Sequence, residues 1–198
     1  LFRSGHIGTT SFFPSKNLGA FGDGGAVFTQ DEKLAQHLKM MANHGQSKKY
    51  VHDVVGVNSR LDTIQAGILN VKLKYLNEFT ASRRKVAEQY DQAFSNQSAI
   101  KIPFRIPSST HVFHQYTIRL ENEKVRNDLQ EYLKSQKIPS VVYYPIPVHL
   151  QKPYRQENLN LPNTEALCRT VLSLPIHTEM TAAEIAYICE KVNHFFNV

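Results

Sequence analysis

Among the residues of this chain that could do chemistry, the most suggestive is one lysine, Lys16, which follows an apolar run and precedes a cluster of glycines. Four glycines lie within the seven residues from 19 to 25. A lysine whose ammonium is partly removed from water loses its proton more readily and can then form a Schiff base. The other interpretation is a solvated surface lysine beside a glycine turn, and the local residues leave both open.

The residues on either side of Lys16 predict a hairpin that presents this side chain. Residues 9–13 are rich in β-branched and aromatic types, which predicts a short buried strand. Pro14 ends that strand, because proline has no N–H to donate to a sheet. The glycines that follow permit positive φ angles and close approach of another chain or a ligand. Residues 26–29 predict the return strand, so we expect a tight hairpin with one amine at its entrance.

Residues 31–42 predict a helix after this hairpin. Asp31 is the expected N-cap, and apolar residues recur on one face of the helix. Gly45 can adopt the left-handed conformation that ends many helices. His44 is favoured at a helix C-terminus by the helix dipole, which is a simpler explanation than a role as a ligand or as an acid–base group.

A second polar group, Asn58, Ser59 and Arg60, precedes a long apolar periodicity. Asp62 heads this pattern, which continues to residue 94 and predicts one long helix that connects two domains. Asn58 or Ser59 could cap that helix, and Arg60 could pair with Asp62. From the residues alone, these structural roles stand beside a role in binding.

The second part of the chain alternates strand and helix patterns. Short runs of β-branched and aromatic residues predict strands at 100–104, 111–120 and 140–144. Apolar periodicity predicts helices at 123–136, 162–171 and 181–196, the last with Thr181 as its N-cap. Prolines 145 and 147 make the segment after the third strand an extended loop. These elements together predict a small α+β layer.

The composition excludes several classes of protein. Of the 198 residues, 41% are hydrophobic and 20% are charged, as in soluble globular proteins. No apolar run predicts a membrane span and no leader predicts secretion, so a cytoplasmic protein is expected. The net charge of +6 is scattered and no nucleic-acid-binding module is recognised, so nucleic acid is not an expected partner. Cys168 and Cys189 lack metal-site spacing and are expected to be reduced core thiols, and no metal site is predicted.

Three segments together resemble one enzyme family. The sequence around Lys16 closely resembles the cofactor-lysine segment of the DegT-type aminotransferases. These are fold-type I enzymes that use pyridoxal 5'-phosphate (PLP) to aminate nucleotide-linked keto-sugars. The resemblance covers essentially the whole chain. It is most specific in Ser-Phe-Phe-Pro-Ser-Lys-Asn-Leu-Gly-Ala-Phe-Gly-Asp-Gly-Gly (11–25), Val-Gly-Val-Asn-Ser-Arg-Leu-Asp-Thr-Ile-Gln-Ala (55–66), and Tyr-Pro-Ile-Pro-Val-His-Leu-Gln (144–151) followed by Ser-Leu-Pro-Ile-His (173–177).

The resemblance implies a PLP site. Lys16 would hold PLP through a Schiff base and carry the proton between the substrate carbon and the cofactor. Ser11 would donate its hydroxyl hydrogen to the cofactor phosphate. Asn58 would reach the phosphate of the PLP held by the neighbouring subunit, so the active site would be shared across a homodimer. In such a site PLP supplies the electron sink and the protein positions it.

The resemblance also implies how the substrate is bound. Arg60 would help hold the nucleotide-sugar, since a guanidinium group suits an anionic diphosphate or carboxylate. Tyr143 and Tyr144 would contact the same substrate. Close relatives that act on acetamido-sugar uronates often carry His-Tyr where this chain has this tyrosine pair. Glutamate is the expected amino donor.

The expected fold class follows from the same resemblance. It is an α/β fold that corresponds to the C-terminal portion of a fold-type I PLP-dependent transferase. Residues 1–78 would form the C-terminal part of the large PLP-binding domain, with the cofactor lysine and the start of the linking helix. Residues 79–198 would form a small C-terminal α+β domain. Family members carry the aspartate that pairs with the pyridinium nitrogen in an N-terminal half, so this chain alone is expected to be colourless.

The expected activity is PLP-dependent conversion of a nucleotide-linked keto-sugar to an amino-sugar, for polysaccharide or glycan precursors. Three other functions are weighed against it. A truncated, non-catalytic PLP-fold fragment could bind a partner. The sugar dehydratases of the family carry histidine where this chain has Lys16, which argues against that class. Residues 19–25 match neither a Walker A loop nor a dinucleotide fingerprint, so a nucleotide-binding loop ranks last.

Overall fold

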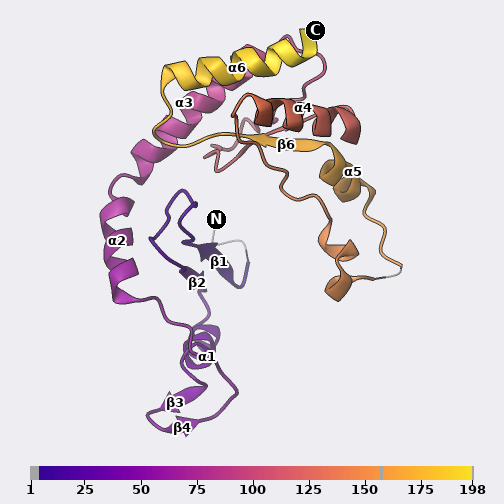
Figure 1. Cartoon of the computed structure of the whole chain (residues 1–198). Helices are drawn as coiled ribbons and strands as arrows, with labels where there is room; N and C mark the ends of the chain where they lie inside the picture. Colours follow the sequence, from indigo (N-terminus) through magenta and orange to yellow (C-terminus); the bar gives the residue numbers. More distant parts are fainter. Residues whose placement is uncertain (1–4, 157, 198) are drawn as a thin grey trace. The chain divides into compact units, whose positions relative to one another are not determined.

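The computed structural model describes residues 5–156 and 158–197 (Figure 1). The chain divides into two compact units, the first ending at Asn77 and the second beginning at Glu78. The assignment of residues 1–78 to a large cofactor domain and of residues 79–198 to a small domain stays a prediction.

The first unit contains the hairpin expected beside the lysine. Strand β1 (Gly8–Ser11) pairs antiparallel with β2 (Gly25–Phe28), and Ser11 lies opposite Gly25. Strand β1 is one residue shorter than the predicted strand at 9–13, and β2 has the predicted length but begins one residue earlier. The prediction of a buried strand is wrong, because β1 alternates between partly buried and exposed residues. Among the described residues this sheet has only two strands, and such a sheet leaves much of its surface open.

Helix α1 (Glu32–Met41) follows, as predicted. Asp31 caps it, because its Oδ1 accepts hydrogen bonds from the backbone N–H groups of Lys33 at 2.8 Å and Leu34 at 3.0 Å. Beyond the helix, Gly45 has a φ of +75°, which confirms the left-handed residue predicted there. Strands β3 (Gln46–Lys48) and β4 (Val51–His52) then form a short hairpin. The sequence did not indicate this hairpin, since the segment is polar and lacks alternation.

The prediction of one long helix is wrong, because α2 (Thr63–Leu73) and α3 (Leu76–Phe94) are separate helices. At the break, the Lys74 N–H bonds to the Val71 carbonyl and the Tyr75 N–H bonds to the Lys72 carbonyl. Contacts to the third preceding residue tighten and end a helix. The apolar periodicity continues across the break without glycine or proline, so the sequence contains no stop signal there.

The second unit is built on a two-stranded antiparallel sheet of β5 (Tyr116–Arg119) and β6 (Val171–Leu174). The predicted strand at 111–120 is therefore confirmed only in its last half. The predicted strands at 100–104 and 140–144 are wrong. Each contributes a single bridge to the sheet, Lys101 to Arg119 and Val141 to Ser173, because prolines close to both segments interrupt the ladder.

The three helices that follow α3 in the second unit lie where they were predicted. They are α4 (Glu123–Ser135), α5 (Pro162–Thr170) and α6 (Ala182–Asn197), with two 3₁₀ turns, η1 (Val148–Leu150) and η2 (Lys152–Tyr154), in the loop before α5. Thr181 caps α6, as expected, in a reciprocal arrangement. Its Oγ1 accepts from the Glu184 N–H at 3.2 Å, and the Glu184 carboxylate accepts from the Thr181 N–H at 2.8 Å.

The hydrophobic core lies in the second unit, between its helices and its sheet. Its largest fully buried side chains are Tyr90, Phe94, Phe113, Tyr116, Ile118, Leu129, Leu133, Leu172 and Val192. The two buried tyrosine hydroxyls have partners, since Tyr90 donates to the Pro175 carbonyl at 2.8 Å and Tyr116 to Asp91 Oδ1 at 2.7 Å. Burial raises the pKa of both tyrosines, so they remain neutral donors.

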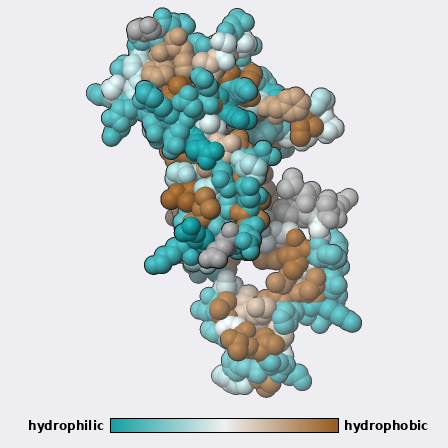
Figure 2. All heavy atoms as spheres, turned by 90° about the vertical axis from the view of Figure 1, so that its right-hand side faces the viewer, coloured by the Kyte–Doolittle hydropathy of each residue, from teal (hydrophilic) through white to brown (hydrophobic). Residues whose placement is uncertain are grey.

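The first unit has very little core of its own. Among its described residues, only Ala20 and Leu69 are buried hydrophobic residues. Figure 2 shows hydrophobic side chains at the surface of the chain. In the first unit, the large hydrophobic residues that are exposed include Phe21, Tyr50, Val55, Val57 and Ile64. A two-stranded sheet with so little buried apolar surface needs another layer for stability.

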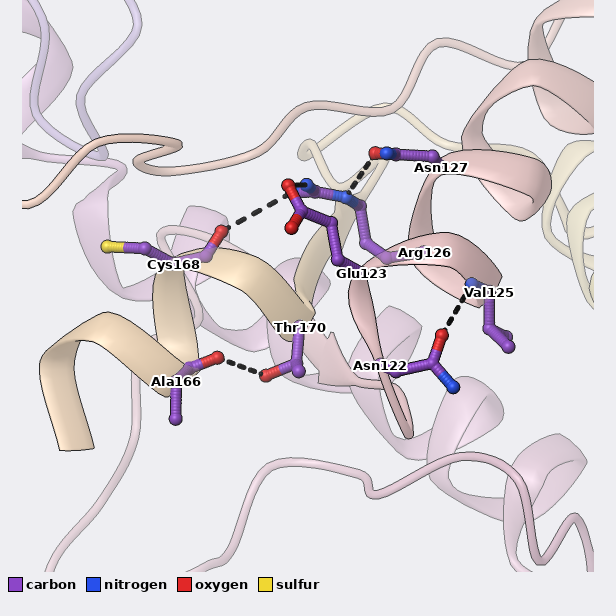
Figure 3. Close-up of polar contacts among 8 residues, drawn as sticks. All are labelled: Asn122, Glu123, Val125, Arg126, Asn127, Ala166, Cys168 and Thr170. Atoms are coloured by element: carbon purple, nitrogen blue, oxygen red, sulfur yellow. Dashed lines mark hydrogen bonds and ion pairs between the residues drawn. The ribbon is translucent and has the colours of Figure 1, made fainter. Parts of the chain in front are cut away.

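A buried arginine connects α4 to α5 (Figure 3). Arg126 donates to the Asn127 side chain at 2.8 Å and to the Cys168 carbonyl at 3.4 Å, and it pairs with Glu123 at 3.5 Å. Thr170, at the end of α5, donates to the Ala166 carbonyl at 2.8 Å. These contacts satisfy polar groups where the two helices meet. Cys168 and Cys189 are free thiols, as expected.

A second buried arginine, Arg83 on α3, binds main-chain carbonyls of the segments before β5 and after β6. Its Nη1 donates to the carbonyl oxygens of His114 and Ile176, each at 3.1 Å, and of Phe113 at 3.3 Å. The side chain is buried, which lowers the pKa of the guanidinium group, but arginine stays charged in proteins. One cation therefore fixes the segment before β5 against the segment after β6.

We expect Arg83→Met to lower the free energy of unfolding of the second unit by about 2 kcal/mol, because buried carbonyls would lose their donor. Lys85→Met, at an exposed position of the same helix, is the control and should change it by less than about 0.5 kcal/mol. Urea unfolding of the two variants measures this difference. Equal stability of the two variants would contradict the role of Arg83.

No helix among residues 5–156 and 158–197 is long and apolar enough to cross a membrane. Within the same residues, no group of three or more histidine, cysteine, aspartate or glutamate side chains is arranged to hold a metal ion.

Candidate active site

Lys16 lies on a compact loop between β1 and β2. The loop is closed by main-chain hydrogen bonds, since the Phe12 N–H donates to the Gly24 carbonyl at 2.8 Å and the Ala20 N–H donates to the Phe12 carbonyl at 2.8 Å. Lys16 itself ends a turn, in which its N–H donates to the Phe13 carbonyl at 2.9 Å. The Lys16 side chain is exposed and makes no hydrogen bond or ion pair with the described part of the chain.

The glycines of this loop serve close packing of the main chain. A Cβ atom at Gly19 would lie 2.4 Å from the Pro14 carbonyl oxygen, and one at Gly25 would lie 2.9 Å from the Thr10 oxygen. The sequence permitted close approach of another chain or a ligand at these glycines, and in the structure it is the main chain of the same hairpin that approaches them. The positive φ angles that these glycines permit are not found, because the only glycine with positive φ among the described residues is Gly45. The loop is thus compact without left-handed backbone.

Ser11 is the last residue of β1 and its side chain is exposed. Its Oγ accepts a hydrogen bond from the Phe13 N–H at 3.2 Å. A serine hydroxyl has one donor hydrogen besides its acceptor lone pairs. The hydroxyl hydrogen of Ser11 therefore stays available for an external acceptor such as a phosphate oxygen.

Asn58 and Arg60 form a pair on the segment that precedes α2. The Arg60 Nε donates to Asn58 Oδ1 at 2.9 Å. Arg60 thus bonds to Asn58, and neither the predicted cap by Asn58 nor a contact of Arg60 with Asp62 is formed. A bridge to Asn43 fixes the main chain of Asn58. Because Oδ1 of Asn58 is engaged, its amide nitrogen is left as a donor.

A broad hollow of about 1300 Å³ lies in the first unit between the hairpin, α1 and this segment. The hollow is thus lined by Asn58 and Arg60 and not by Lys16 and Ser11, the two residues predicted to bind the cofactor of their own chain. The lining residues are Thr9, Thr10, Asp23–Gln30, Ala35, Leu38, Lys39, Met41, Ala42 and Val57–Leu61.

Tyr143 and Tyr144 belong to the second unit. Both are exposed, and their ring centroids lie 5.6 Å apart at an interplanar angle of 74°. They precede the proline-rich loop that contains η1 and η2 (Figure 1). Their rings are accessible to a ligand of the second unit.

The loop after the tyrosines is fixed by a buried histidine, which the site prediction did not include. His149 is 6% exposed, and its Nε2 lies 3.1 Å from Glu165 Oε1 in the first turn of α5. Because an ionised carboxylate only accepts hydrogen bonds, Nε2 is the donor. This hydrogen bond lowers the pKa of the Glu165 carboxyl. The motif containing His149 was recognised, but its partner becomes evident only in the folded chain.

The sequence matches one protein family over most of its length. The model of the DegT/DnrJ/EryC1/StrS aminotransferase family matches residues 3–193. A UDP-2-acetamido-2-deoxy-3-oxo-D-glucuronate aminotransferase of Pseudomonas aeruginosa is 44% identical, with 95% of this chain and 51% of the relative covered. A protein of Geobacillus stearothermophilus, named a pleiotropic regulatory protein, is 41% identical, with 97% and 52% covered.

Solved structures agree with this match. The chain resembles the crystal structure of DesV of S. venezuelae, solved in complex with a ketimine intermediate. The TM-score is 0.90 and the identity is 36%, with 98% of this chain and 53% of that chain covered. The fold is therefore that of a fold-type I aminotransferase, and the chain spans about half the length of the curated relatives it matches, consistent with their C-terminal half.

Proposed function

The chain belongs to the DegT/DnrJ/EryC1/StrS aminotransferase family, whose members depend on PLP, and from this premise we propose that it forms part of a nucleotide-sugar aminotransferase. The reaction would convert a nucleotide-linked keto-sugar to an amino-sugar with glutamate as amino donor. The observation that carries the proposal is Lys16, an exposed and unpaired amine on a loop closed by main-chain hydrogen bonds.

The side chains of the first unit fit a phosphate-bearing aldehyde cofactor. Lys16 offers the amine that would hold the aldehyde carbon, Ser11 a free hydroxyl hydrogen, and Asn58 a free amide nitrogen. Hydroxyl and amide donors both suit phosphate oxygens. When bound, PLP would supply an electron sink for the carbon that loses its proton.

Lys16 is the residue of this chain that we propose to transfer the proton. Its Nζ must be neutral to take up the proton from the substrate carbon, and it must then return a proton on the cofactor side. Lysine can do this because its pKa falls readily when other groups cover it, whereas arginine stays protonated. A loop that holds the amine in a fixed position favours such a transfer.

We propose that Arg60, Tyr143 and Tyr144 contact the substrate. Arg60 carries a guanidinium group that suits a diphosphate, and Asn58 orients it through the 2.9 Å hydrogen bond. Tyr143 and Tyr144 offer two exposed aromatic faces for the sugar or the base. His149 and Glu165 keep the loop beside the tyrosines in place.

We propose a homodimer with shared active sites. The hollow in the first unit supports this, because Asn58 and Arg60 line it and Lys16 and Ser11 do not. The apolar side chains exposed on the first unit also fit a unit that another layer covers. Location in the cytoplasm stays a prediction.

The proposal is tested on the full-length gene product that contains this chain. It should be yellow with PLP bound, and borohydride should fix the cofactor covalently to the peptide that contains Lys16, as mass spectrometry would detect. A colourless full-length protein without label on this peptide would overturn the proposal and favour a non-catalytic fragment that binds a partner.

A further inference from the structure

Two side chains of α2 bind the main chain of the loop that carries Lys16. The Lys72 Nζ donates to the Gly19 carbonyl oxygen at 2.6 Å, and the Gln65 Oε1 accepts from the Phe21 N–H at 2.9 Å. The two residues are seven positions apart, about two helical turns, so they lie on the same face of the helix. The loop thus has two polar attachments to one rigid element.

The attachment by Lys72 lies in a partly covered place. Gly19 and Ala20 are buried, and Ala20 is 1% exposed. The Lys72 side chain is half-buried, and its Nζ lies 5.2 Å from the centroid of the Phe21 ring, within the range of a cation–π contact. A hydrogen bond from an ammonium group to a buried carbonyl is stronger than one between neutral groups. The Lys72 side chain is therefore held against the loop and does not extend into solvent.

Direct main-chain contacts connect Gly19, where Lys72 is bound, to the turn that carries Lys16. A Cβ atom at Gly19 would overlap the Pro14 carbonyl, so these two residues are packed main chain to main chain. Pro14 lies inside the turn that the Lys16 N–H closes onto the Phe13 carbonyl at 2.9 Å. These contacts link the main chain at Gly19 to the turn that carries Lys16.

We propose that Lys72 and Gln65 are positioning residues that hold the loop on α2 and thereby set the position of the Lys16 amine. The inference rests on the proposed function for the role of that amine. The attachment of the loop to α2 is a property of the folded chain and does not depend on the proposed function. Neither residue touches the reacting atoms.

The test compares Lys72→Met, Gln65→Leu and Lys72→Arg with Lys74→Met, a control at an exposed lysine of the turn that follows α2. The hydrogen-exchange rate of the Ala20 and Phe21 amides measures how firmly the loop is attached to α2, and this measurement needs no cofactor. Exchange should be about 10- to 100-fold faster in Lys72→Met and Gln65→Leu, and close to wild type in Lys72→Arg and in the control. Unchanged exchange in Lys72→Met would overturn the inference.

A second measurement reads the Lys16 amine itself. In the full-length protein with PLP, the pH midpoint of the cofactor absorbance should shift in Lys72→Met and return in Lys72→Arg, with kcat reduced more than KM. Faster exchange with an unchanged midpoint would show a merely structural attachment and would overturn the positioning role. If wild type shows no such absorbance, the proposed function fails, and the rate of Lys16 acetylation by acetic anhydride then decides the positioning role in the same way.

Discussion

Replacing Lys16 with alanine is expected to lower the rate of amino transfer by the full-length enzyme at least about 10²- to 10⁴-fold, the range typical of a lost proton-transfer group. The reason is chemical, because Lys16 is the one side chain proposed to carry a proton at the reacting carbon. Lys16→Arg should lose as much, since a guanidinium group keeps its proton. Steady-state assays with the keto-sugar and glutamate measure both variants.

The matched control for Lys16 is Lys33→Ala, an exposed lysine in the first turn of α1. It should keep nearly full activity and full borohydride labelling. The Lys16 variants should fold normally, because the Lys16 side chain is exposed and makes no hydrogen bond or ion pair with the described residues. Substantial activity in Lys16→Arg would contradict the role of a neutral amine.

The local sequence was sufficient to predict a helix where a specific residue marks its start or its end, such as a capping side chain or a left-handed glycine. Asp31 and Thr181 cap their helices through the hydrogen bonds that their types predict. The strands at 100–104 and 140–144 failed for a different reason. Their apolar residues fit a strand, but in the fold each segment meets the sheet at one bridge only. Apolar pattern predicts burial, whereas a strand also needs a continuous partner.

In the candidate site, too, some features could be predicted from the sequence and others could not. The type and spacing of Lys16, Ser11 and Asn58 could be read from the sequence because they lie in short motifs. The contacts that hold these motifs could not, since Lys72 reaches Gly19 across 53 positions and His149 reaches Glu165 across 16. Such pairs are set by tertiary packing, and single-sequence patterns contain no distance between distant segments.

Gly45 controls the geometry of the Asn58 segment. A Cβ atom there would lie 1.7 Å from the Val54 carbonyl oxygen, and Gly45 already has a φ of +75°. Next to it, the His44 N–H donates to the Val57 carbonyl at 2.9 Å, and the Ser59 N–H donates to the Ala42 carbonyl at 2.9 Å. The end of α1 and the segment before α2 are therefore paired around a crossing that only glycine permits.

We therefore expect Gly45→Ala to destabilise the first unit by about 2–5 kcal/mol, the sum of left-handed strain and of overlap with a rigid carbonyl. Gly67→Ala is the matched control, because nothing lies within 4 Å of its Cβ position inside α2, and it should stabilise by about 0.5–1 kcal/mol. Hydrogen exchange at the His44 and Ser59 amides measures local opening within the first unit, so it is the appropriate measurement. The same variant should also weaken PLP retention by the full-length protein, because the Asn58–Arg60 pair would be displaced. Wild-type exchange at both amides would show that the crossing adapts to a methyl group, and the fixed position assigned to Asn58 would then have to be abandoned.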